Sequence, residues 1–282
     1  MRAALDGFDS TDEPAWATIS VDADVVAPPE AEPQSELYHI RYWDAPGDAV
    51  VAGSAGLVLF VDGLEAHAHL PDLDALQDFE ACVYLPLTWM LARRDRFILH
   101  GAAVERDGVA FLVLGHSGAG KSTLAAAALE AGWRVLADDV VIVHQVEDGF
   151  RIHGVHRTPA FPMEIGGSLT ESATPLGDPR DRAELPRDVL TGGEHELVGV
   201  LLLVHSEDDE GSLERAKGAR VLPLLLQSFA GSIDPGLRAG FFGTAGALCR
   251  LPVWELGHAA DPARRRERAV HHLDACVAEL SL

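Results

Sequence analysis

Residues 109–122 read VAFLVLGHSGAGKS, and this stretch determines the fold class. Val109–Leu114 is uninterruptedly apolar, which is typical of a strand buried on both faces of a sheet. Gly115–Ser122 then matches the pattern G-x-x-x-x-G-K-[ST] of a phosphate-binding loop. Residues 122–131 are rich in Ala and Leu and predict a helix that ends at Gly132. A strand, a glycine-rich loop and a helix in this order predict an α/β domain.

The residue types of the loop predict how it binds a ligand. Glycines let backbone N–H groups turn towards phosphate oxygens, and the N-terminus of the following helix adds a favourable potential. Lys121 is expected to reach the outer phosphates, and the hydroxyl of Ser122 to hold Mg²⁺. The alternative is a glycine-rich turn before an ordinary helix. The predicted cofactors are ATP and Mg²⁺, bound by Gly115, His116, Ser117, Gly118, Ala119, Gly120, Lys121, Ser122 and Thr123.

A second strand is predicted before the first, over residues 97–105, because the Asp107-Gly108 pair between the two strands is a hairpin signal. In a two-residue hairpin Arg106 pairs with Val109, and the same register continued places His100 opposite Gly115. His100 is therefore expected at the mouth of the loop. The alternative is a core histidine whose hydrogen bonds are satisfied by its neighbours.

The segment after the helix carries paired carboxylates. Residues 134–139 predict a strand that ends in Asp138 and Asp139, the usual position of a metal-organising acid beside a phosphate loop. Two more strands, 140–146 and 150–153, are expected where a doubly wound fold would place a helix. We therefore expect a mixed sheet with antiparallel additions. The remaining predicted elements are strands at 197–204 and 251–256 and an amphipathic helix at 261–280.

The composition changes along the chain and predicts three parts. Residues 1–36 are acidic and contain several prolines, which indicates a flexible arm around one short strand at 17–21. Residues 37–95 predict a small β-rich module with a bridging helix over 79–94. Residues 96–282 form the predicted phosphate-loop domain. The strands expected in the module are 37–43, 56–61 and 65–70.

The charge of the chain excludes several classes of partner. The formal net charge is −22, whereas sequence-independent binding of nucleic acid needs a basic face, and an anionic membrane would repel an acidic surface. Three cysteines without C-x-x-C spacing suit reduced thiols, and no apolar run approaches the roughly twenty residues of a spanning helix. We expect a cytoplasmic protein that binds neither nucleic acid nor membrane. Its acidity serves either solubility or contact with a basic partner.

Three segments in this order, Leu99-His100-Gly101, Gly115–Thr123 and Leu136–Val140, resemble the catalytic core of the HPr kinase/phosphorylase family, particularly its shorter kinase-like relatives. The resemblance implies a domain similar to the phosphoenolpyruvate-carboxykinase type of phosphate-loop fold, ATP-dependent phosphorylation of a serine hydroxyl, and a homo-oligomer. It also implies site roles by position. Lys121 would stabilise the transferring phosphoryl group, Ser122 and Asp139 would hold Mg²⁺, Asp139 would accept the serine proton with support from Asp138, and His100 would lie beside the phosphates.

Two features depart from the family pattern. The family's second signature, which is acidic and rich in glycine, is absent, and Met163–Gly167 is its nearest counterpart, so the resemblance assigns a further metal contact to Glu164. His116 stands where the family usually has an aspartate. These departures count against HPr itself as the substrate. Shorter relatives occur beside peptide-modification genes, so the implied acceptor is a serine-containing peptide or small protein.

Two other functions fit the same loop. A small-molecule kinase would hold its acceptor in a buried polar pocket. A non-catalytic protein could instead use ATP to gate binding by its N-terminal module. A regulatory GTPase is excluded, because it needs an N-K-x-D motif and Lys217, the only lysine besides Lys121, lies in the sequence Arg215-Ala216-Lys217-Gly218.

Overall fold

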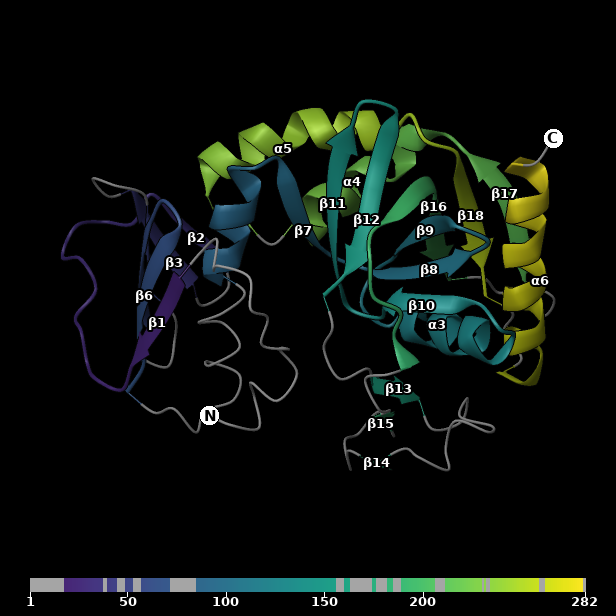
Figure 1. Cartoon of the computed structure of the whole chain (residues 1–282), viewed down its shortest axis with the longest axis horizontal. Coiled ribbons are helices and arrows are strands. Elements are labelled where there is room, and N and C mark those ends of the chain that lie inside the picture. The colour runs from purple at the N-terminus through teal and green to yellow at the C-terminus, as the bar shows by residue number, and fades with distance from the viewer. Residues whose placement is uncertain are drawn as a thin grey trace. The chain divides into compact units, whose positions relative to one another are not determined.

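The computed structural model describes residues 18–37, 40–44, 49–52, 57–71, 85–155, 160–162, 174–175, 182–184, 189–205, 211–229, 231, 234–258 and 262–280. The chain divides into two compact units (Figure 1). One unit comprises Met1–Ile98 and Phe229–Phe242, and the other comprises Leu99–Ser228 and Gly243–Leu282. Residues 229–242, which the sequence placed with the phosphate-loop domain, therefore cluster with the N-terminal unit.

The N-terminal unit is built on a six-stranded sheet in the order β1-β6-β5-β4-β3-β2. Its core contains Leu59 and Ala66 from the sheet together with Trp89 and Met90 from the helical residues 85–92. Trp89 also donates a hydrogen bond through Nε1 to Oδ2 of Asp234, at 2.9 Å, so the returning segment is tied to this core. The strands are β1 (Thr18–Asp22), β2 (Ser35–Leu37), β3 (Ile40–Asp44), β4 (Ala49–Ala52), β5 (Val58–Asp62) and β6 (Glu65–His69).

The second unit contains a nine-stranded mixed sheet in the order β10-β8-β9-β16-β12-β11-β7, with β18 beside β16 and β17 beside β18. β9, β16 and β18 run parallel, and the described pairings of β8, β10, β11, β12 and β17 are antiparallel. The predicted mixed α/β sheet is confirmed. The strands are β7 (Arg96–His100), β8 (Ala102–Arg106), β9 (Val109–Leu114), β10 (Arg134–Ala137), β11 (Val140–Val146), β12 (Gly149–Gly154), β16 (His195–Val204), β17 (Ser212–Ala216) and β18 (Val253–Gly257).

The described helices agree with the sequence prediction in part. α3 (Lys121–Glu130) follows the glycine-rich loop, and α6 (Pro262–Leu280) closes the chain; both agree with the sequence prediction. α4 (Leu222–Ser228) and α5 (Pro235–Leu248) were not predicted. A small separate sheet consists of β13 (Ala160–Pro162), β14 (Thr174–Pro175) and β15 (Arg182–Glu184). Among the described helices, none is both long and apolar enough to cross a lipid bilayer.

The strand predicted over residues 97–105 is in fact two strands. The register of β8 with β9 is as predicted, with Arg106 opposite Val109, but the ladder stops at the pair Ala102–Val113. A side chain at Gly101 would crowd the carbonyl oxygen of Val113, and the N–H of Gly101 donates to the carbonyl of Asp139 at 2.9 Å. The chain therefore leaves the hairpin at Gly101. The prediction that His100 lies opposite Gly115 was wrong, because β7 joins the far edge of the sheet next to β11.

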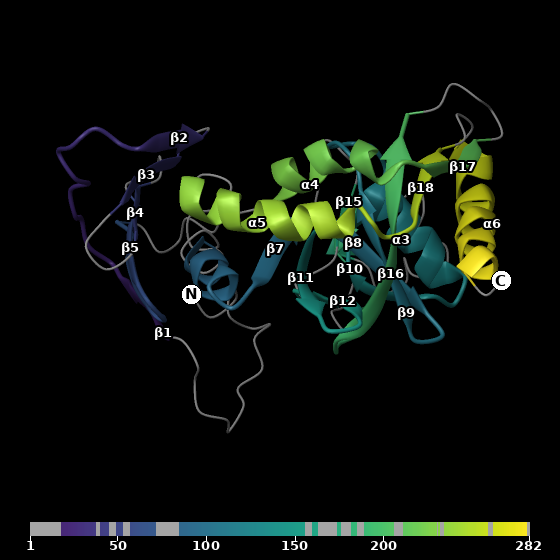
Figure 2. The same ribbon diagram turned by 90° about the horizontal axis from the view of Figure 1, so that it is seen from above.

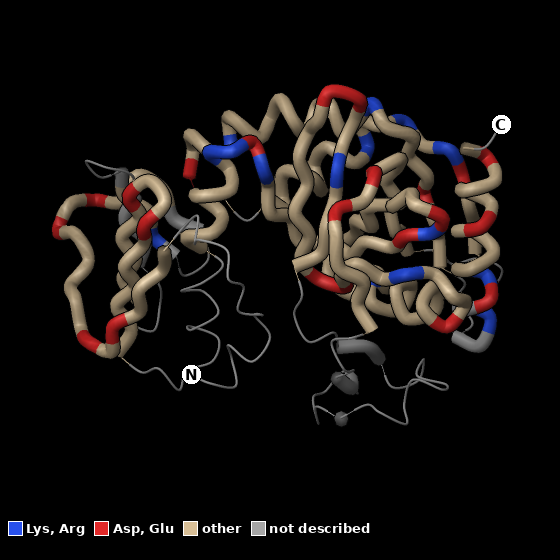
Figure 3. Tube along the Cα trace, viewed as in Figure 1, with Lys and Arg blue, Asp and Glu red and all other residues tan. Residues whose placement is uncertain are grey.

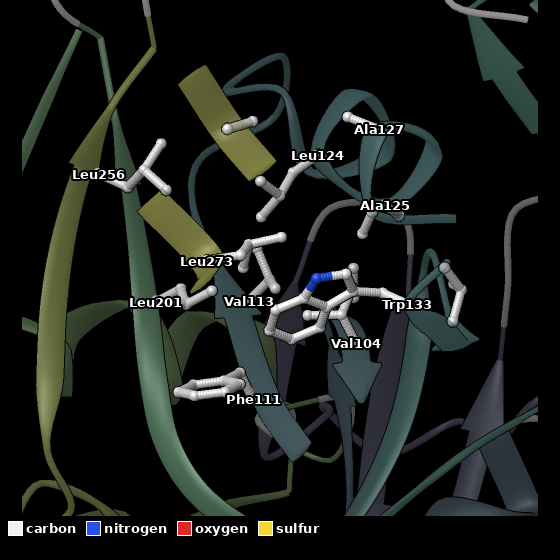
Figure 4. Packing of buried hydrophobic residues seen from close by; sticks show 14 of the residues in the cluster. Val104, Phe111, Val113, Leu124, Ala125, Ala127, Trp133, Leu201, Leu256 and Leu273 are labelled. Atoms are coloured by element: carbon white, nitrogen blue, oxygen red, sulfur yellow. The ribbon is translucent and has the colours of Figure 1, made fainter. Parts of the chain in front are cut away.

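The main hydrophobic core lies between one face of the sheet and helices α3 and α6, which lie side by side (Figures 1 and 2). Phe111 and Val113 of β9 project towards Leu124 of α3 and Leu273 of α6, and Trp133 packs beside them (Figure 4). The small residues 125–128 of α3 allow this close approach of helix to sheet. This packing fixes the position of α3, and with it the loop that precedes the helix.

Candidate functional site

The glycine-rich loop connects the end of β9 to the start of α3. Gly118 and Gly120 have φ values of 80° and 98°, a backbone region that favours glycine. Gly120 is the N-cap residue of α3, and no side chain caps this helix end or places an acid in its first turn. Gly115 packs tightly against Leu203 of β16, which anchors the start of the loop. The N-terminus of α3 can therefore offer its backbone N–H groups to an anion.

Lys121 is the first residue of α3 and is only 8% exposed. Its Nζ donates to the carbonyl oxygen of Gly115 at 2.9 Å, so the side chain folds back over the loop. Burial lowers the pKa of Lys121, and the negative charge of Asp139 partly opposes this shift. The lysine and the carboxylate therefore interact electrostatically, as expected for groups that share one site.

Asp139 lies just beyond the end of β10 and binds His100. The distance from His100 Nδ1 to Asp139 Oδ1 is 2.9 Å, and the two side chains are 55% and 39% exposed. His100 thus contacts Asp139, whereas the predicted hairpin register that would place it opposite Gly115 does not form. Asp138, its neighbour in the chain, is buried. The structure brings His100, Lys121 and Asp139 together.

The other predicted site residues are distributed as follows. Ser122 and Thr123 occupy the first turn of α3 and are half-buried, directly after Lys121. Glu164 lies outside the described residues. Within the described part of the chain, no three His, Cys, Asp or Glu side chains gather in a way that would hold a metal ion. The assignment of Mg²⁺ to Ser122, Asp139 and Glu164 stays a prediction.

A cavity of about 990 Å³ opens beside the loop. It is lined by the loop residues His116–Gly120, by the carboxyl end of β16 and by α4, and His258 stands directly after β18. The carboxyl ends of parallel strands are where open α/β sheets bind their ligands. The sequence analysis missed three cavity residues outside the motif, namely Arg220, His258 and Arg265. Only a weak signal for one of them is present in the sequence, because His258 follows the predicted strand 251–256 closely, and its place at the cavity depends on the observed pairing of β18 with β16.

The charge of this cavity is opposite to that of the chain. Two arginines and three histidines line it, and none of the described lining residues is acidic. Elsewhere, Asp and Glu residues, drawn in red, occupy many of the turns of both units, in keeping with the net charge of −22 (Figure 3). Arg220 is paired with Glu255 of β18, but the described lining itself carries basic and no acidic side chains, and this favours an anionic ligand.

His258 is the most unusual side chain of the cavity. It is 9% exposed, and neither ring nitrogen makes a hydrogen bond of good geometry to a described residue, although the backbone of Gly120 and Ala119 lies close enough to interact with the ring. Burial lowers its pKa to about 4, and the positive charge of Arg265 acts in the same direction, whereas the nearby carbonyl groups of Gly120 and Ala119 oppose the shift. The ring is therefore neutral at physiological pH.

Comparisons with known proteins agree with the motif resemblance over part of the chain. Residues 75–163, which include His100, the loop and Asp139, match the family model for the SynChlorMet cassette protein ScmC. An HPr kinase/phosphorylase of Treponema pallidum (strain Nichols) is 41% identical over 91 residues, 31% of this chain and 28% of the relative. An HPr kinase/phosphorylase of Peptoclostridium acidaminophilum is 35% identical over 69 residues, 24% of this chain and 22% of the relative. The predicted similarity to HPr kinase/phosphorylases is thus confirmed, although the matches span less than a third of either relative.

A solved structure, the HPr(Ser) kinase/phosphatase from Coxiella burnetii, is also similar to this chain. The two share 14% sequence identity and a TM-score of 0.34, over 65% of this chain and 91% of that chain.

Proposed function

We propose that this chain is an ATP-dependent kinase of the HPr-kinase type, which transfers the γ-phosphoryl group of ATP to a serine hydroxyl of a peptide or small protein. We also propose that its phosphate-loop domain is of the phosphoenolpyruvate-carboxykinase type. One observation carries the proposal. Asp139 contacts His100 and interacts electrostatically with Lys121, so a carboxylate and an ammonium group share a site at the start of α3.

The residues around the loop fit a triphosphate. The helix end is uncapped, two loop glycines have the positive φ values that turn N–H groups inward, and the adjoining cavity is cationic. When bound, ATP would supply the phosphoryl group, and Mg²⁺ would neutralise part of its charge. The hydroxyl of Ser122 and the carboxylate of Asp139 are oxygen donors of the kind that Mg²⁺ prefers.

The roles of the side chains follow from their chemistry. In the transfer, the serine oxygen forms a bond to the γ-phosphorus, and the bond between this phosphorus and the oxygen of the leaving ADP breaks. Asp139 accepts the proton of the serine hydroxyl. Lys121 leaves the carbonyl of Gly115 and stabilises the charge on the transferring group. His100 holds the carboxylate of Asp139 in place through Nδ1.

The exposure of the pair supports a macromolecular acceptor. His100 and Asp139 are both substantially open to solvent, and neither lines the cavity beside the loop. A small-molecule kinase would be expected to enclose its acceptor. An open base beside the phosphate loop is better suited to a serine presented on a peptide or protein.

Mass spectrometry of serine-containing peptides incubated with ATP and Mg²⁺ tests the proposal. We expect the wild-type chain to add the mass of one phosphate to a peptide serine. Asp139→Asn should lower turnover by about 10²- to 10⁴-fold and still bind ATP, since a general base contributes about this much. Lys121→Met should lose ATP binding, and Asp138→Asn is the matched control for the choice of base. A wild-type protein that binds ATP but phosphorylates no peptide, protein or small alcohol would instead favour a nucleotide-gated binding protein.

A further inference from the structure

His258 has a chemistry that the proposed transfer does not use. Its ring lies against the loop so closely that a methyl group at Gly120 would collide with Nε2. The residue is nine-tenths buried and lines the cavity, and its ring nitrogens make no hydrogen bond of good geometry to a described residue, only weaker backbone contacts with Gly120 and Ala119. Buried polar groups are almost always hydrogen-bonded, and exceptions call for an explanation. A ligand in the cavity that supplies the missing partner is such an explanation.

The protonation state of the ring narrows the chemistry of this partner. A neutral imidazole carries one N–H donor and one acceptor nitrogen. Phosphate oxygens are acceptors only, and the backbone amide groups at the start of α3 and the ammonium group of Lys121 already suit them. The ribose hydroxyls and the edge of a nucleobase offer both donors and acceptors, so they match a neutral histidine better than a phosphate does.

The wall of the cavity beyond His258 fits the same part of the ligand. Pro223 and Leu224 of α4 and Leu202 of β16 contribute apolar surface, and Gln227 adds an amide at the end of α4. Ligand sites are commonly apolar with a few polar groups that fix orientation. This wall can receive a flat base, and His258 lies against Gly120 of the loop that would hold the phosphates.

We propose that His258 is a nucleotide-binding residue, which hydrogen-bonds the nucleoside end of the bound nucleotide and sets its position relative to the phosphate loop. The inference rests on the proposed function, because it takes ATP as the ligand. It explains why a buried histidine without a well-formed hydrogen bond lies at this place, and why Gly120, which its ring contacts, has no side chain. It assigns to β18 a role in nucleoside recognition.

Calorimetric titration of the full chain with ATP and with inorganic tripolyphosphate tests this role. His258→Leu removes both nitrogens without extending towards Gly120, and His258→Asn keeps a donor and an acceptor. We expect His258→Leu to weaken ATP binding by about tenfold or more and to leave tripolyphosphate binding unchanged. We expect His258→Asn to bind ATP within about threefold of wild type. The melting temperature of nucleotide-free His258→Leu should equal or exceed that of wild type, because no hydrogen bond of good geometry is lost and an apolar side chain suits the buried position.

Several results would overturn the assignment. Unchanged ATP affinity in His258→Leu would remove His258 from the binding site. Equal losses of affinity for ATP and for tripolyphosphate in His258→Leu would mean that His258 only supports the structure of the loop. A lower melting temperature of nucleotide-free His258→Leu would mean the same. If His258→Leu does not fold, NMR of labelled histidine in wild type decides: ATP must shift the His258 signals and tripolyphosphate must leave them in place. Wild type that binds ATP without transferring phosphate would refute the proposed kinase but not this inference.

Discussion

The buried imidazole of His258 makes the stability of the phosphate-loop unit depend on pH. The pKa of His258 is lowered from 6.5 to about 4 in the folded chain. Between these two pH values the ring is therefore mostly neutral in the folded protein and mostly protonated in the unfolded chain. The stabilising contribution of the neutral ring is complete above the unfolded value and is lost as the pH falls from 6.5 towards 4. From about pH 7 to about pH 5 the loss should be about 2 kcal/mol.

The matched variant His258→Asn isolates this effect, because it does not titrate. Arg265 and His272 of α6 are the other charged or titratable groups that act on the ring, and they are unchanged in the variant. We expect urea denaturation followed by tryptophan fluorescence to show that wild type loses about 2 kcal/mol more unfolding free energy than His258→Asn between about pH 7 and about pH 5. A difference that does not change with pH would refute the reasoning. A directly measured NMR pKa of His258 near its ordinary value would refute it as well.

Substitutions at three further positions have defined outcomes. His100→Ala should reduce phosphotransfer by about 10- to 100-fold with unchanged ATP affinity, because Asp139 loses the group that orients it; His100→Asn, which keeps a donor, should recover part of this loss in steady-state assays. Gly120→Ala should lower the unfolding free energy, measured by urea denaturation, by about 1–3 kcal/mol, because φ at this position is positive and the new methyl group would collide with the imidazole of His258. Its affinity for tripolyphosphate should fall as well. Glu105→Gln should lower the unfolding free energy by about 1–3 kcal/mol without changing ATP affinity, because the substitution removes the buried negative charge that pairs with the guanidinium group of Arg134. Unchanged stability of this last variant would contradict the account of the pair.

The expected cost at Glu105 follows from its environment. The carboxylate is fully buried in β8 and accepts hydrogen bonds from the guanidinium of Arg134 and the backbone N–H of Gly108. Burial by itself raises the pKa of Glu105, but these two hydrogen bonds outweigh it and hold the pKa below its ordinary value. Arg134 is half exposed and can be rehydrated when the carboxylate is changed, so the estimate lies below that for a fully buried pair.

Patterns local in the sequence predicted the centre of the fold. The apolar run 109–114, the loop and α3 follow from hydrophobicity and glycine positions over adjacent residues. The hairpin of β11 and β12 was predicted in the same way and forms with Val146 opposite Gly149. Such features depend on the backbone preferences of a few neighbouring residues, which the sequence displays directly.

Contacts between distant segments were not predictable in this way. The break at Gly101 depends on the carbonyl of Asp139, which lies between β10 and β11, distant in the chain. The return of residues 229–242 to the N-terminal unit depends on Trp89, far away in the chain. His258 was missed because a single histidine after a strand is not unusual until the parallel pairing of β16 with β18 places it beside Gly120. Tertiary pairing, and not local propensity, decides these positions.

The two halves of the site differ in exposure, and this difference bears on how a reaction would proceed. Lys121 and His258 are buried beside the cavity, whereas His100 and Asp139 are open to solvent. The nucleotide would therefore be held by groups shielded from water, where hydrogen bonds and charges act more strongly. The acceptor would approach the exposed carboxylate. Lys121 belongs to the buried half but also interacts electrostatically with Asp139, so its release from the carbonyl of Gly115 on nucleotide binding would change the charge felt by the proposed base.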